Sequence, residues 1–340
     1  MTISDKDRSA VDVSVIIPNL DGGTHLCAAI DTLFSTTGPT IEVIVVDNGS
    51  VDGSADEAVA MDKRVRVLRN QQNLGFAPAC NQGAGESRGR LLLFLNNDAR
   101  ITGEALSALA EAMGDERLWA VQPALFRDRE GGALDSAGSQ FTRTGFLRHL
   151  AAIPNGRGPV PIFAAKGACL LVRADRFRYV GGFDDSFFAY FEDSDLCWRM
   201  RLAGGDVALV PQVAALHGTG LTTRRFFSPA EIDFMSFRNR LWSILTNCEK
   251  RTLLVILPAH LAASLATAIA FLGSGRPSSA AAIVRAMATP LLHQRQWRTK
   301  RPRVQELRAR SDRGVFSEEV TAPMGPRDAV RLLRDYLPRW

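Results

Sequence analysis

The alternation of short apolar runs with helical stretches, from residue 11 to about residue 220, most constrains what this chain can fold into. Runs at 13–17, 41–46, 65–68 and 91–95 are rich in β-branched residues or leucine, and helix-compatible stretches stand between them. Strands separated by helices are typical of βαβ units, whose parallel strands form a sheet that is buried on both faces. The sequence therefore predicts an α/β fold with a mostly parallel sheet flanked by helices.

The C-terminal part of the chain has a different character. Residues 252–275 form a stretch of 24 residues without Asp, Glu, Lys or Arg, and a weaker apolar stretch follows at 278–292. The first stretch is long enough to span a bilayer, although Pro258, His260 and many alanines dilute it. Three interpretations stay open: a membrane-embedded or interfacial helical hairpin, a soluble helical domain, and a transmembrane span.

The length of 340 residues suits two ordinary domains, or one large α/β domain with an appendage. We expect a disordered N-terminus at 1–10 and an α/β domain at 11–245. A helical extension, apolar and basic and associated with a membrane, is expected at 246–340.

The net charge of +5 is concentrated in one segment. Between Gln294 and Arg313, eight basic residues stand against two acidic ones, so this segment carries +6 and the rest of the chain −1. A nucleic-acid-binding footprint would spread over a folded face, so a nucleic-acid partner is disfavoured. A basic cluster beside an apolar segment favours an anionic membrane surface as a partner, with a solvated basic helix as the alternative.

Cysteine usage and the N-terminal residues bear on the compartment. The five cysteines are an odd number and form no CxxC pair, which disfavours a disulfide framework and a zinc ribbon. No apolar segment follows a basic start at the N-terminus, so no signal peptide is expected. The predicted location is cytoplasmic, at the inner face of the plasma membrane.

The middle of the chain is weakly patterned. Residues 126–160 are rich in Gly, Arg and Pro. We predict a long, partly mobile loop or lid there, followed by a strand at 163–172.

Polar residues gather where the predicted strands end. Asp47, Asn73 and the run Asn96-Asn97-Asp98 each follow one of these strands. In parallel sheets, ligands bind at the carboxyl ends of the strands. A divalent ion that bridges two phosphates needs oxygen ligands, usually one or two carboxylates, and Asp98 suits that role.

These residues also have structural interpretations. Asp47 stands in an Asp-Asn-Gly sequence, which is an ordinary turn. Asn73 could cap a helix, and Gly75 would let the backbone approach a ligand closely. Asp98 is too far upstream to cap the next helix, for which Thr102 or the glycine after it is better placed.

The segment from Gly181 to Arg199 is the most specific motif. It holds five acids among aromatic residues: Asp184, Asp185, Glu192, Asp193 and Asp195. A carboxyl group near apolar rings has a raised pKa, which suits a general base near neutral pH. Stabilisation of a helix N-terminus accounts for one or two of the acids but not for five.

His217 follows an apolar run and sits in a glycine-rich loop. A lone histidine is more often structural than a ligand. In this setting a metal or phosphate role and a structural role remain equally open.

Together these motifs resemble glycosyltransferase family 2, and most of all its rhamnosyltransferase-like branch. Their order and spacing carry the resemblance, which extends over residues 11–245. The matching stretches are Val13-Ser14-Val15-Ile16-Ile17-Pro18-Asn19, Val46-Asp47-Asn48-Gly49-Ser50, Asn73-Leu74-Gly75-Phe76, Leu95-Asn96-Asn97-Asp98, Gly182-Phe183-Asp184, Glu192-Asp193-Ser194-Asp195-Leu196 and Arg238-Asn239-Arg240.

The resemblance implies a GT-A fold, which is Rossmann-like, with a nucleotide-diphosphate-sugar donor and a divalent metal, Mg²⁺ or Mn²⁺. It implies that Asp193, of the Glu192–Asp193 pair, is the catalytic base and that Asp98 and His217 bind the metal. The donor-binding residues it implies are Pro18, Asn19, Asp47, Asn73, Gly75, Asn96 and Asn97, with Asp47 at the base or ribose. One departure is that Asn96 replaces the first Asp of the family's DxD motif, and an amide is a weaker metal ligand than a carboxylate.

The implied activity is an inverting transfer of a sugar, with rhamnose the first candidate, to a glycan or polyprenyl-linked acceptor in cell-surface polysaccharide synthesis. Two alternatives stay open. One is a catalytically inactive scaffold that binds sugar nucleotides, and the other is a nucleotidyltransferase. The latter would need basic residues in the loop after the first strand, and residues 19–23 hold none.

Overall fold

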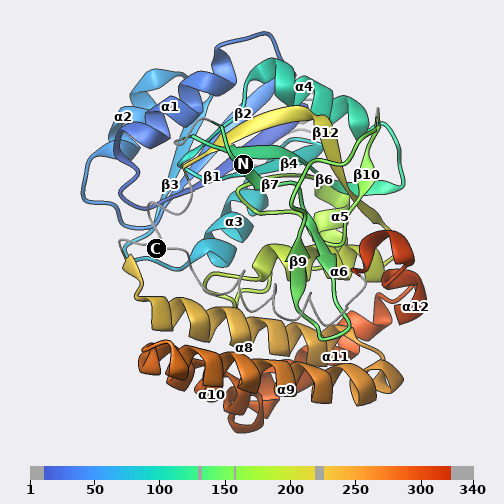
Figure 1. Ribbon diagram of the computed structural model, residues 1–340. Coiled ribbons are helices and arrows are strands. Elements are labelled where there is room, and N and C mark those ends of the chain that lie inside the picture. Colours follow the sequence, from blue (N-terminus) through green and yellow to red (C-terminus); the bar gives the residue numbers. More distant parts are fainter. Residues whose placement is uncertain (1–10, 129–131, 157, 219–225, 323–340) are drawn as a thin grey trace.

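The computed structural model describes residues 11–128, 132–156, 158–218 and 226–322. Residues 1–10, for which disorder is expected, and residues 323–340, the end of the expected extension, lie outside the described residues. Figure 1 shows the sheet and its covering helices in the upper part of the molecule, with helices α8 to α11 gathered below.

The four predicted strands are confirmed and form one half of the main sheet. They are β1 (Val13–Asn19), β2 (Ile41–Asp47), β3 (Val65–Arg69) and β4 (Leu91–Leu95). All four are parallel, in the order β4-β1-β2-β3. Their carboxyl ends therefore meet at one edge of the sheet.

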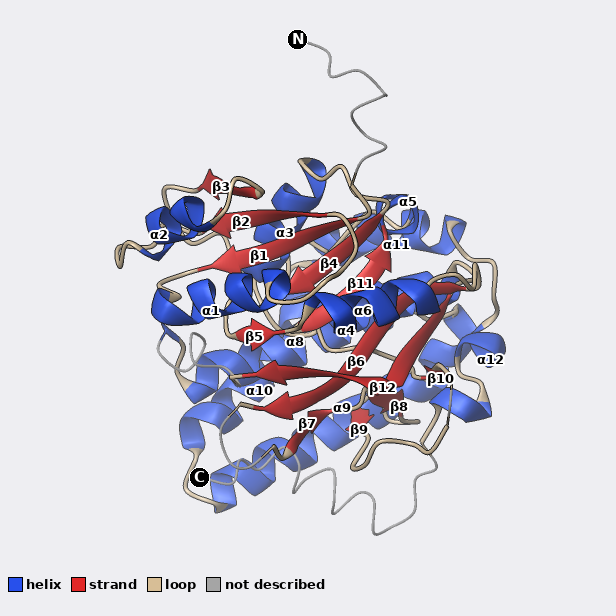
Figure 2. Cartoon of the chain, turned by 90° about the horizontal axis from the view of Figure 1, so that it is seen from above, coloured by secondary structure: helices blue, strands red, loops and turns tan. Residues whose placement is uncertain are grey.

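Helices cover both faces of this sheet (Figure 2). One face carries α1 (Gly23–Phe34), α2 (Ser54–Met61) and α4 (Gly103–Ala112), and the other carries α3 (Phe76–Gly85), α5 (Ala174–Tyr179) and α6 (Glu192–Leu202). Val15 and Ile17 of β1 pack in the first layer and Ile16 in the second, as the two-residue period of a strand requires. Burial of both faces explains why the strands are apolar throughout.

The other half of the sheet contains the strands that run in the opposite direction. It comprises β6 (Leu118–Arg127), β11 (Cys169–Arg173), β12 (Asp206–His217), β10 (Val160–Pro161), β5 (Ala99–Arg100) and β7 (Leu134–Ser136). Those that run in the opposite direction are β11 and the short strands β5, β7 and β10. The sheet order is β10-β12-β6-β11-β4-β1-β2-β3, with β5 paired to β12 and β7 to β6. Since β11 is antiparallel to both β4 and β6, and β12 is parallel to β6, the long strands other than β11 share one direction. The expected mostly parallel sheet is confirmed.

The expectation of a loop or lid at 126–160 is wrong for the described residues of that segment. They contain β7 and a small hairpin of β8 (Ser139–Phe141) and β9 (Leu147–His149). Phe141 and Phe146 are buried, and Phe141 stacks on Phe316 with 4.4 Å between ring centroids. Strands of three residues are too short to show a period in the sequence. The strand expected at 163–172 begins only at Cys169.

The C-terminal elements are α8 (Pro229–Asn247), α9 (Lys250–Gly273), α10 (Pro277–Leu292), α11 (Gln294–Glu306), α12 (Asp312–Val315) and the 3-10 turn η2 (Glu318–Val320). Helix α8 continues past residue 245. Beyond α11 the chain returns to the α/β part, where the Ala309 N–H donates to the Leu202 carbonyl (2.9 Å). Val315 and Val320 then pack in the same core as α3 and α6.

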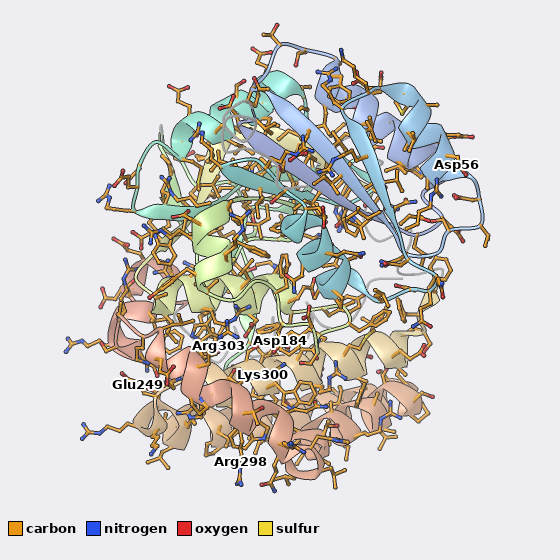
Figure 3. The ribbon with its side chains drawn as sticks, turned by 180° about the vertical axis from the view of Figure 1, so that it is seen from behind. Asp56, Asp184, Glu249, Arg298, Lys300 and Arg303 are labelled. Atoms are coloured by element: carbon orange, nitrogen blue, oxygen red, sulfur yellow. The ribbon has the colours of Figure 1, made fainter. Side chains whose placement is uncertain are left out.

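Half of the basic residues between 294 and 313 bind other parts of the protein. Lys300 pairs with Asp184 in the loop before α6 (Figure 3), and Arg301 donates to a carbonyl of α8. Arg308 pairs with a carboxylate of α12 at 2.9 Å, and Arg310 with one of β12 at 2.7 Å. The four that remain exposed are Arg295, Arg298, Arg303 and Arg313.

Candidate active site

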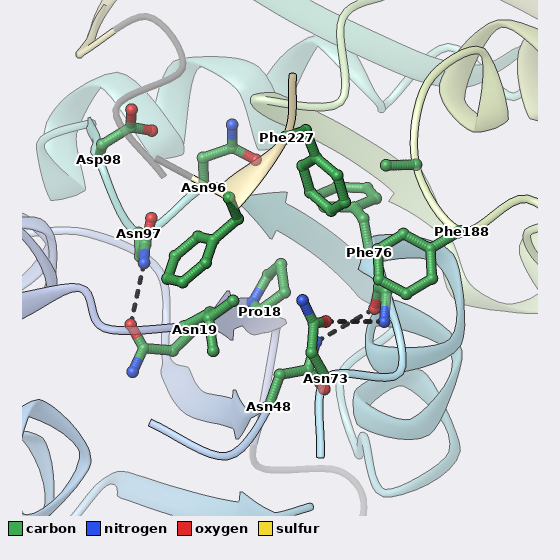
Figure 4. A pocket seen from close by; sticks show the side chains of 14 residues that line it. Pro18, Asn19, Asn48, Asn73, Phe76, Asn96, Asn97, Asp98, Phe188 and Phe227 are labelled. Atoms are coloured by element: carbon green, nitrogen blue, oxygen red, sulfur yellow. Dashed lines mark hydrogen bonds between the residues drawn. The ribbon is translucent and has the colours of Figure 1, made fainter. Parts of the chain in front are cut away.

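A pocket lies at the carboxyl ends of β1, β2 and β4 (Figure 4). The start of α3, the turn before α6 and the residues before α8 close its sides. Its lining residues are Pro18, Asn19, Leu20, Asn48, Asn73, Gly75, Phe76, Asn96, Asn97, Asp98, Phe188, Ala189, Phe226 and Phe227. Six of the seven residues expected to bind the donor therefore line this pocket. The seventh, Asp47, does not.

Asp47 is buried and holds the pocket residue Asn19. The Asn19 amide donates to Asp47 Oδ1 (3.3 Å) and accepts a hydrogen bond from Asn97 (2.9 Å), which Figure 4 shows. Ser50 also donates to Asp47 Oδ1. Because Asn19 ends β1 and Asn97 follows β4, this network fixes the ends of neighbouring strands relative to each other.

Gly75 allows a close backbone approach, but to the protein itself. It adopts φ +96°, and a Cβ there would lie 2.5 Å from the Phe188 carbonyl oxygen. That carbonyl accepts a hydrogen bond from the Phe76 N–H (2.7 Å). Asn73 accepts from the Gly75 N–H at 2.9 Å, and Asn48 donates to the Gly75 carbonyl at 3.2 Å. The start of α3 is thereby joined to the aromatic turn before α6.

Asp98 and His217 lie together although 119 residues separate them. The distance from Asp98 Oδ1 to His217 Nε2 is 3.4 Å, and the Asn96 amide lies 3.2 Å from the same nitrogen. The pairing of β12 with β5 brings His217 opposite Ala99, next to Asp98. Thr102 caps α4, as expected, by accepting from the Ala105 N–H (3.1 Å), so Asp98 has no capping role there.

Sequence reasoning missed Asp135 and Lys166. Asp135, on β7, accepts a hydrogen bond from His217 Nδ1 (2.9 Å) and pairs with Lys166 Nζ (2.6 Å). Burial opposes ionisation of Asp135, but these two partners outweigh it and lower its pKa to about 2. Burial likewise opposes a charge on His217, yet hydrogen bonds to Asp135 and Asp98 raise its pKa above the ordinary value. The only sequence signal for Asp135 was an acid in the segment predicted as a loop.

The Asp98–His217 pair fits a divalent cation. Asp135 holds Nδ1, so that Nε2 faces Asp98, and a carboxylate behind a histidine is the usual support for a metal-binding imidazole. Among the described residues no three His, Cys, Asp or Glu side chains converge on one point. Two protein ligands leave the other positions to substrate phosphates and water, as hard cations at phosphate sites prefer.

Asp193 lies beside the Asn96 end of β4. Its Oδ2 accepts a hydrogen bond from the Gly167 N–H (2.8 Å), and the next residue, Ala168, accepts one from the Asn96 N–H (3.0 Å). The N–H and hydroxyl of Ser194 bind Asp193 Oδ1 at 2.6 and 3.0 Å. The carboxylate is thus held in one orientation by the residue next to the one that contacts Asn96.

Glu192 differs from its neighbour. Its side chain is buried, and Oε2 has no hydrogen-bond partner among the described residues. Burial, and then the charge of Asp193, raise the pKa of Glu192 well above its ordinary value. Glu192 is not among the residues that line the pocket.

The backbone before this pair is strained. Tyr190 and Phe191 both adopt the left-handed region, at φ +70° and +71°. The buried amide of Asn239, on α8, donates to the carbonyls of Ala189 (3.0 Å) and Tyr190 (2.7 Å). Strained residues persist only where surrounding structure holds them, and they concentrate at functional sites.

Three of the five acids in this segment have structural partners. Asp184 pairs with Lys300, and Asp185 accepts from Asn81 (2.6 Å). Asp195 pairs with Arg199 at 2.7 Å and accepts from two α8 side chains. These partners are structural roles other than stabilisation of a helix N-terminus, and they arise because the loop and α6 pack against elements far away in the sequence.

Comparison with known proteins shows the family. Residues 14–177 match the model of Glycosyl transferase family 2. The N-acetylglucosaminyl-diphospho-decaprenol L-rhamnosyltransferase of Mycobacterium tuberculosis is 31% identical over 241 residues, which cover 62% of this chain and 77% of the relative.

Solved structures show the fold. Staphylococcus aureus TarS 1–349 in complex with UDP-GlcNAc matches with a TM-score of 0.57 at 16% identity, covering 87% of this chain and 90% of that one. The mannosyltransferase PcManGT of Pyrobaculum calidifontis, in complex with GDP-Man and Mn²⁺, matches with a TM-score of 0.52 at 18% identity, covering 87% and 85%. These likenesses confirm the expected GT-A fold with its C-terminal helical region. The chain belongs to glycosyltransferase family 2 and is rhamnosyltransferase-like within it.

Proposed function

We propose that this chain is an inverting, metal-dependent glycosyltransferase of cell-surface polysaccharide synthesis. It would move a sugar, with rhamnose the first candidate, from a nucleotide-diphosphate donor to a glycan or polyprenyl-linked acceptor. The similarity to a relative named for transfer to a decaprenol-linked sugar supports this acceptor class. The single observation that carries the proposal is that Asp193 and Asn96 are hydrogen-bonded to two consecutive residues, Gly167 and Ala168. These bonds bring the carboxylate of Asp193 next to the end of β4.

In this mechanism Asp193 is the base. It takes the proton of an acceptor hydroxyl, whose oxygen attacks the anomeric carbon while the bond from that carbon to the diphosphate oxygen breaks on the opposite face. The three hydrogen bonds to Asp193 support this role because they orient the carboxylate before the acceptor arrives. The raised pKa of the buried Glu192 favours its neutral form, which would leave the negative charge on Asp193.

The donor would occupy the pocket of Figure 4. Its side-chain amides, Asn19, Asn73, Asn96 and Asn97, offer both donors and acceptors to a nucleotide and its phosphates. Asp47 would act on the base or ribose through its hold on Asn19. The rings of Phe188 and Phe227, in edge contact at 5.7 Å, would close the side of the pocket nearest the turn before α6.

Asp98 and His217 would hold the divalent cation, Mg²⁺ or Mn²⁺. When bound, such an ion neutralises the charge that develops on the leaving diphosphate. Asp135 keeps the imidazole of His217 turned toward Asp98. Lys166, 2.6 Å from Asp135, adds a positive charge near this group.

The two parts of the chain would have separate functions. Residues 11–245 would carry the reaction, and the extension from 246 onward would hold the enzyme at the cytoplasmic face of the plasma membrane. Helix α9 is long and apolar enough to cross a membrane by length and composition alone.

The test is donor hydrolysis and transfer. The purified full chain is incubated with Mg²⁺ or Mn²⁺ and a panel of dTDP-, UDP- and GDP-sugars, beside Asp193→Asn and, as a matched control, Asp31→Asn at an exposed carboxylate of α1. Release of one nucleotide diphosphate by the wild type and the control, but not by Asp193→Asn, is the expected result. Nucleotide-induced thermal stabilisation without turnover of any donor or acceptor would favour the inactive scaffold instead. Release of inorganic diphosphate from a nucleoside triphosphate would favour the nucleotidyltransferase.

A further inference from the structure

Helix α9 has the polarity of a helix that faces lipid. Its buried stripe contains three polar side chains, His260, Ser264 and Thr267. Its exposed stripe runs through Leu254, Pro258, Ala262, Leu265, Ile269 and Leu272 at steps of three or four residues, and every member is apolar. A surface helix in water shows the reverse pattern, with its polar residues outward.

The exposed fractions are large. They are 79% for Leu254, 63% for Ile269 and 61% for Leu272. Helix α10, which packs on α9 through Ile283 and Ala286, continues the pattern with Leu291 at 72%. Contiguous apolar surface of this kind marks a contact with membrane or protein.

Helix α9 is held along the folded domain over most of its length. Near its middle, His260 binds the Thr144 carbonyl (2.9 Å), and its ring lies 4.9 Å from that of Phe146 between centroids. Near its end, Phe271 packs in one cluster with Phe237 of α8. Ile256 to Phe271 corresponds to roughly 22 Å of helix, against about 30 Å of bilayer hydrocarbon. A helix so attached cannot cross the bilayer without drawing the domain into it.

The charge around the hairpin formed by α9 and α10 indicates what binds its exposed apolar stripe. Residues 250–305 contain nine Lys and Arg and no Asp or Glu. Lys250 and Arg251 are exposed at the start of α9, Arg285 on α10, and Arg295 and Arg298 on α11. A second copy of this chain would bring the same positive charges against them, whereas anionic lipid headgroups complement them.

We infer that the α9–α10 hairpin lies flat in the interface of an anionic bilayer, with the exposed stripe of α9 in the acyl region and its cations at the headgroups. This inference rests on the proposed function, because membrane binding serves an enzyme whose acceptor is linked to a lipid. Phe226 and Phe227 line the donor pocket immediately before α8, and α8 packs against α10 (Figure 1). A polyprenyl-linked acceptor held in the same bilayer would thus reach the pocket from the α8 side.

The experiment is co-sedimentation of the full chain with vesicles of phosphatidylcholine, with or without phosphatidylglycerol. The variants are Leu265→Ser/Ile269→Ser, Arg295→Gln/Arg298→Gln, and the matched control Val59→Ser/Met61→Ser, whose side chains are exposed on α2 (48% and 39%). We expect binding to the anionic vesicles, weakened at least about tenfold by each of the first two changes and unchanged by the control. Thermal unfolding of each variant confirms that it is folded.

Besides failure of the wild type to bind the anionic vesicles, three results would overturn the inference. They are equal binding of the Leu265→Ser/Ile269→Ser variant, retention on the vesicles after alkaline carbonate, which indicates a span, and a concentration-dependent dimer that this variant abolishes. Donor hydrolysis is measured on the same samples without lipid. If the wild type does not bind the vesicles but still hydrolyses the donor, the inference about the hairpin is refuted and the proposed transferase activity stands. If it binds the vesicles but hydrolyses no donor, only the transferase proposal is refuted.

Discussion

Replacement of Asn239 by alanine tests whether α8 positions Glu192 and Asp193, the pair for which we propose the catalytic role. Asn239 is fully buried, and its amide donates both of its hydrogens to the turn before α6. The two residues in that turn with positive φ, Tyr190 and Phe191, immediately precede Glu192 and Asp193. The change therefore releases the turn, although Asn239 itself does not line the pocket.

The magnitudes follow from the contacts. A non-glycine residue in the left-handed region costs about 1–2 kcal/mol, so the two together cost about 2–4 kcal/mol. Each buried carbonyl left without its donor costs about 1–3 kcal/mol. We expect Asn239→Ala to lower the free energy of unfolding by about 2–5 kcal/mol, and the turn to relax toward negative φ. A base displaced by about 1 Å loses on the order of a hundredfold in rate.

The assay combines urea denaturation with steady-state kinetics of sugar transfer. The expected result is a kcat about a hundredfold lower, with a smaller change in KM for the donor, because the donor residues Asn19, Asn73 and Asn96 lie on other elements. Ser243→Ala is the control. Ser243 lies on α8, as Asn239 does, and the change removes its buried hydrogen bond to Asp195 of α6 (2.7 Å). A kcat within about threefold of wild type in Asn239→Ala, or an equal loss in Ser243→Ala, would refute the positioning role.

Three further predictions concern the site. The pKa of Glu192 is higher in the folded than in the unfolded state. The contribution of Glu192 to the free energy of unfolding is therefore complete below the unfolded-state pKa of 4.5 and is lost as the pH rises through the folded-state pKa. Glu192→Gln should therefore be more stable than wild type at neutral pH, with the difference vanishing near pH 4 in denaturant titrations; a constant difference would contradict the burial argument. Asp135→Ala should weaken Mn²⁺ binding about 10–100-fold in a calorimetric titration, because His217 loses its orienting partner; unchanged affinity would refute that orienting role. Gly75→Ala should destabilise the fold by about 1–3 kcal/mol, since its Cβ would meet the Phe188 carbonyl; an unchanged melting temperature would refute that contact.

The pocket in which we propose that the donor binds was largely predictable from the sequence. Parallel strands bring their carboxyl ends to one edge, so a residue that follows an apolar run is placed by that fact alone. Asn19, Asn96, Asn97 and Asp98 line the pocket for this reason. Asp47 also ends a parallel strand, but it binds Asn19 of the neighbouring strand and does not line the pocket. Which side chains at the sheet edge bind one another depends on which strands are neighbours.

The Asp98–His217–Asp135 group was only partly predictable. Asp98 follows a recognisable strand and His217 ends one, but their contact depends on the pairing of β12 with β5. Asp135 stands on a three-residue strand whose place is set by pairing with β6. No local period marks a strand that short, so the orienting residue of the histidine is visible only in the folded chain.

The sequence by itself determined the parallel half of the sheet, the pocket edge and the apolar character of α9, because these depend on local periodicity and chain direction. Only the tertiary structure decided which acids are available for chemistry, with Asp184, Asp185 and Asp195 bound to distant partners and Glu192 buried. It also decided that the polar stripe of α9 faces inward. Burial and pairing are properties of contacts between residues far apart in the chain, and no local pattern encodes them.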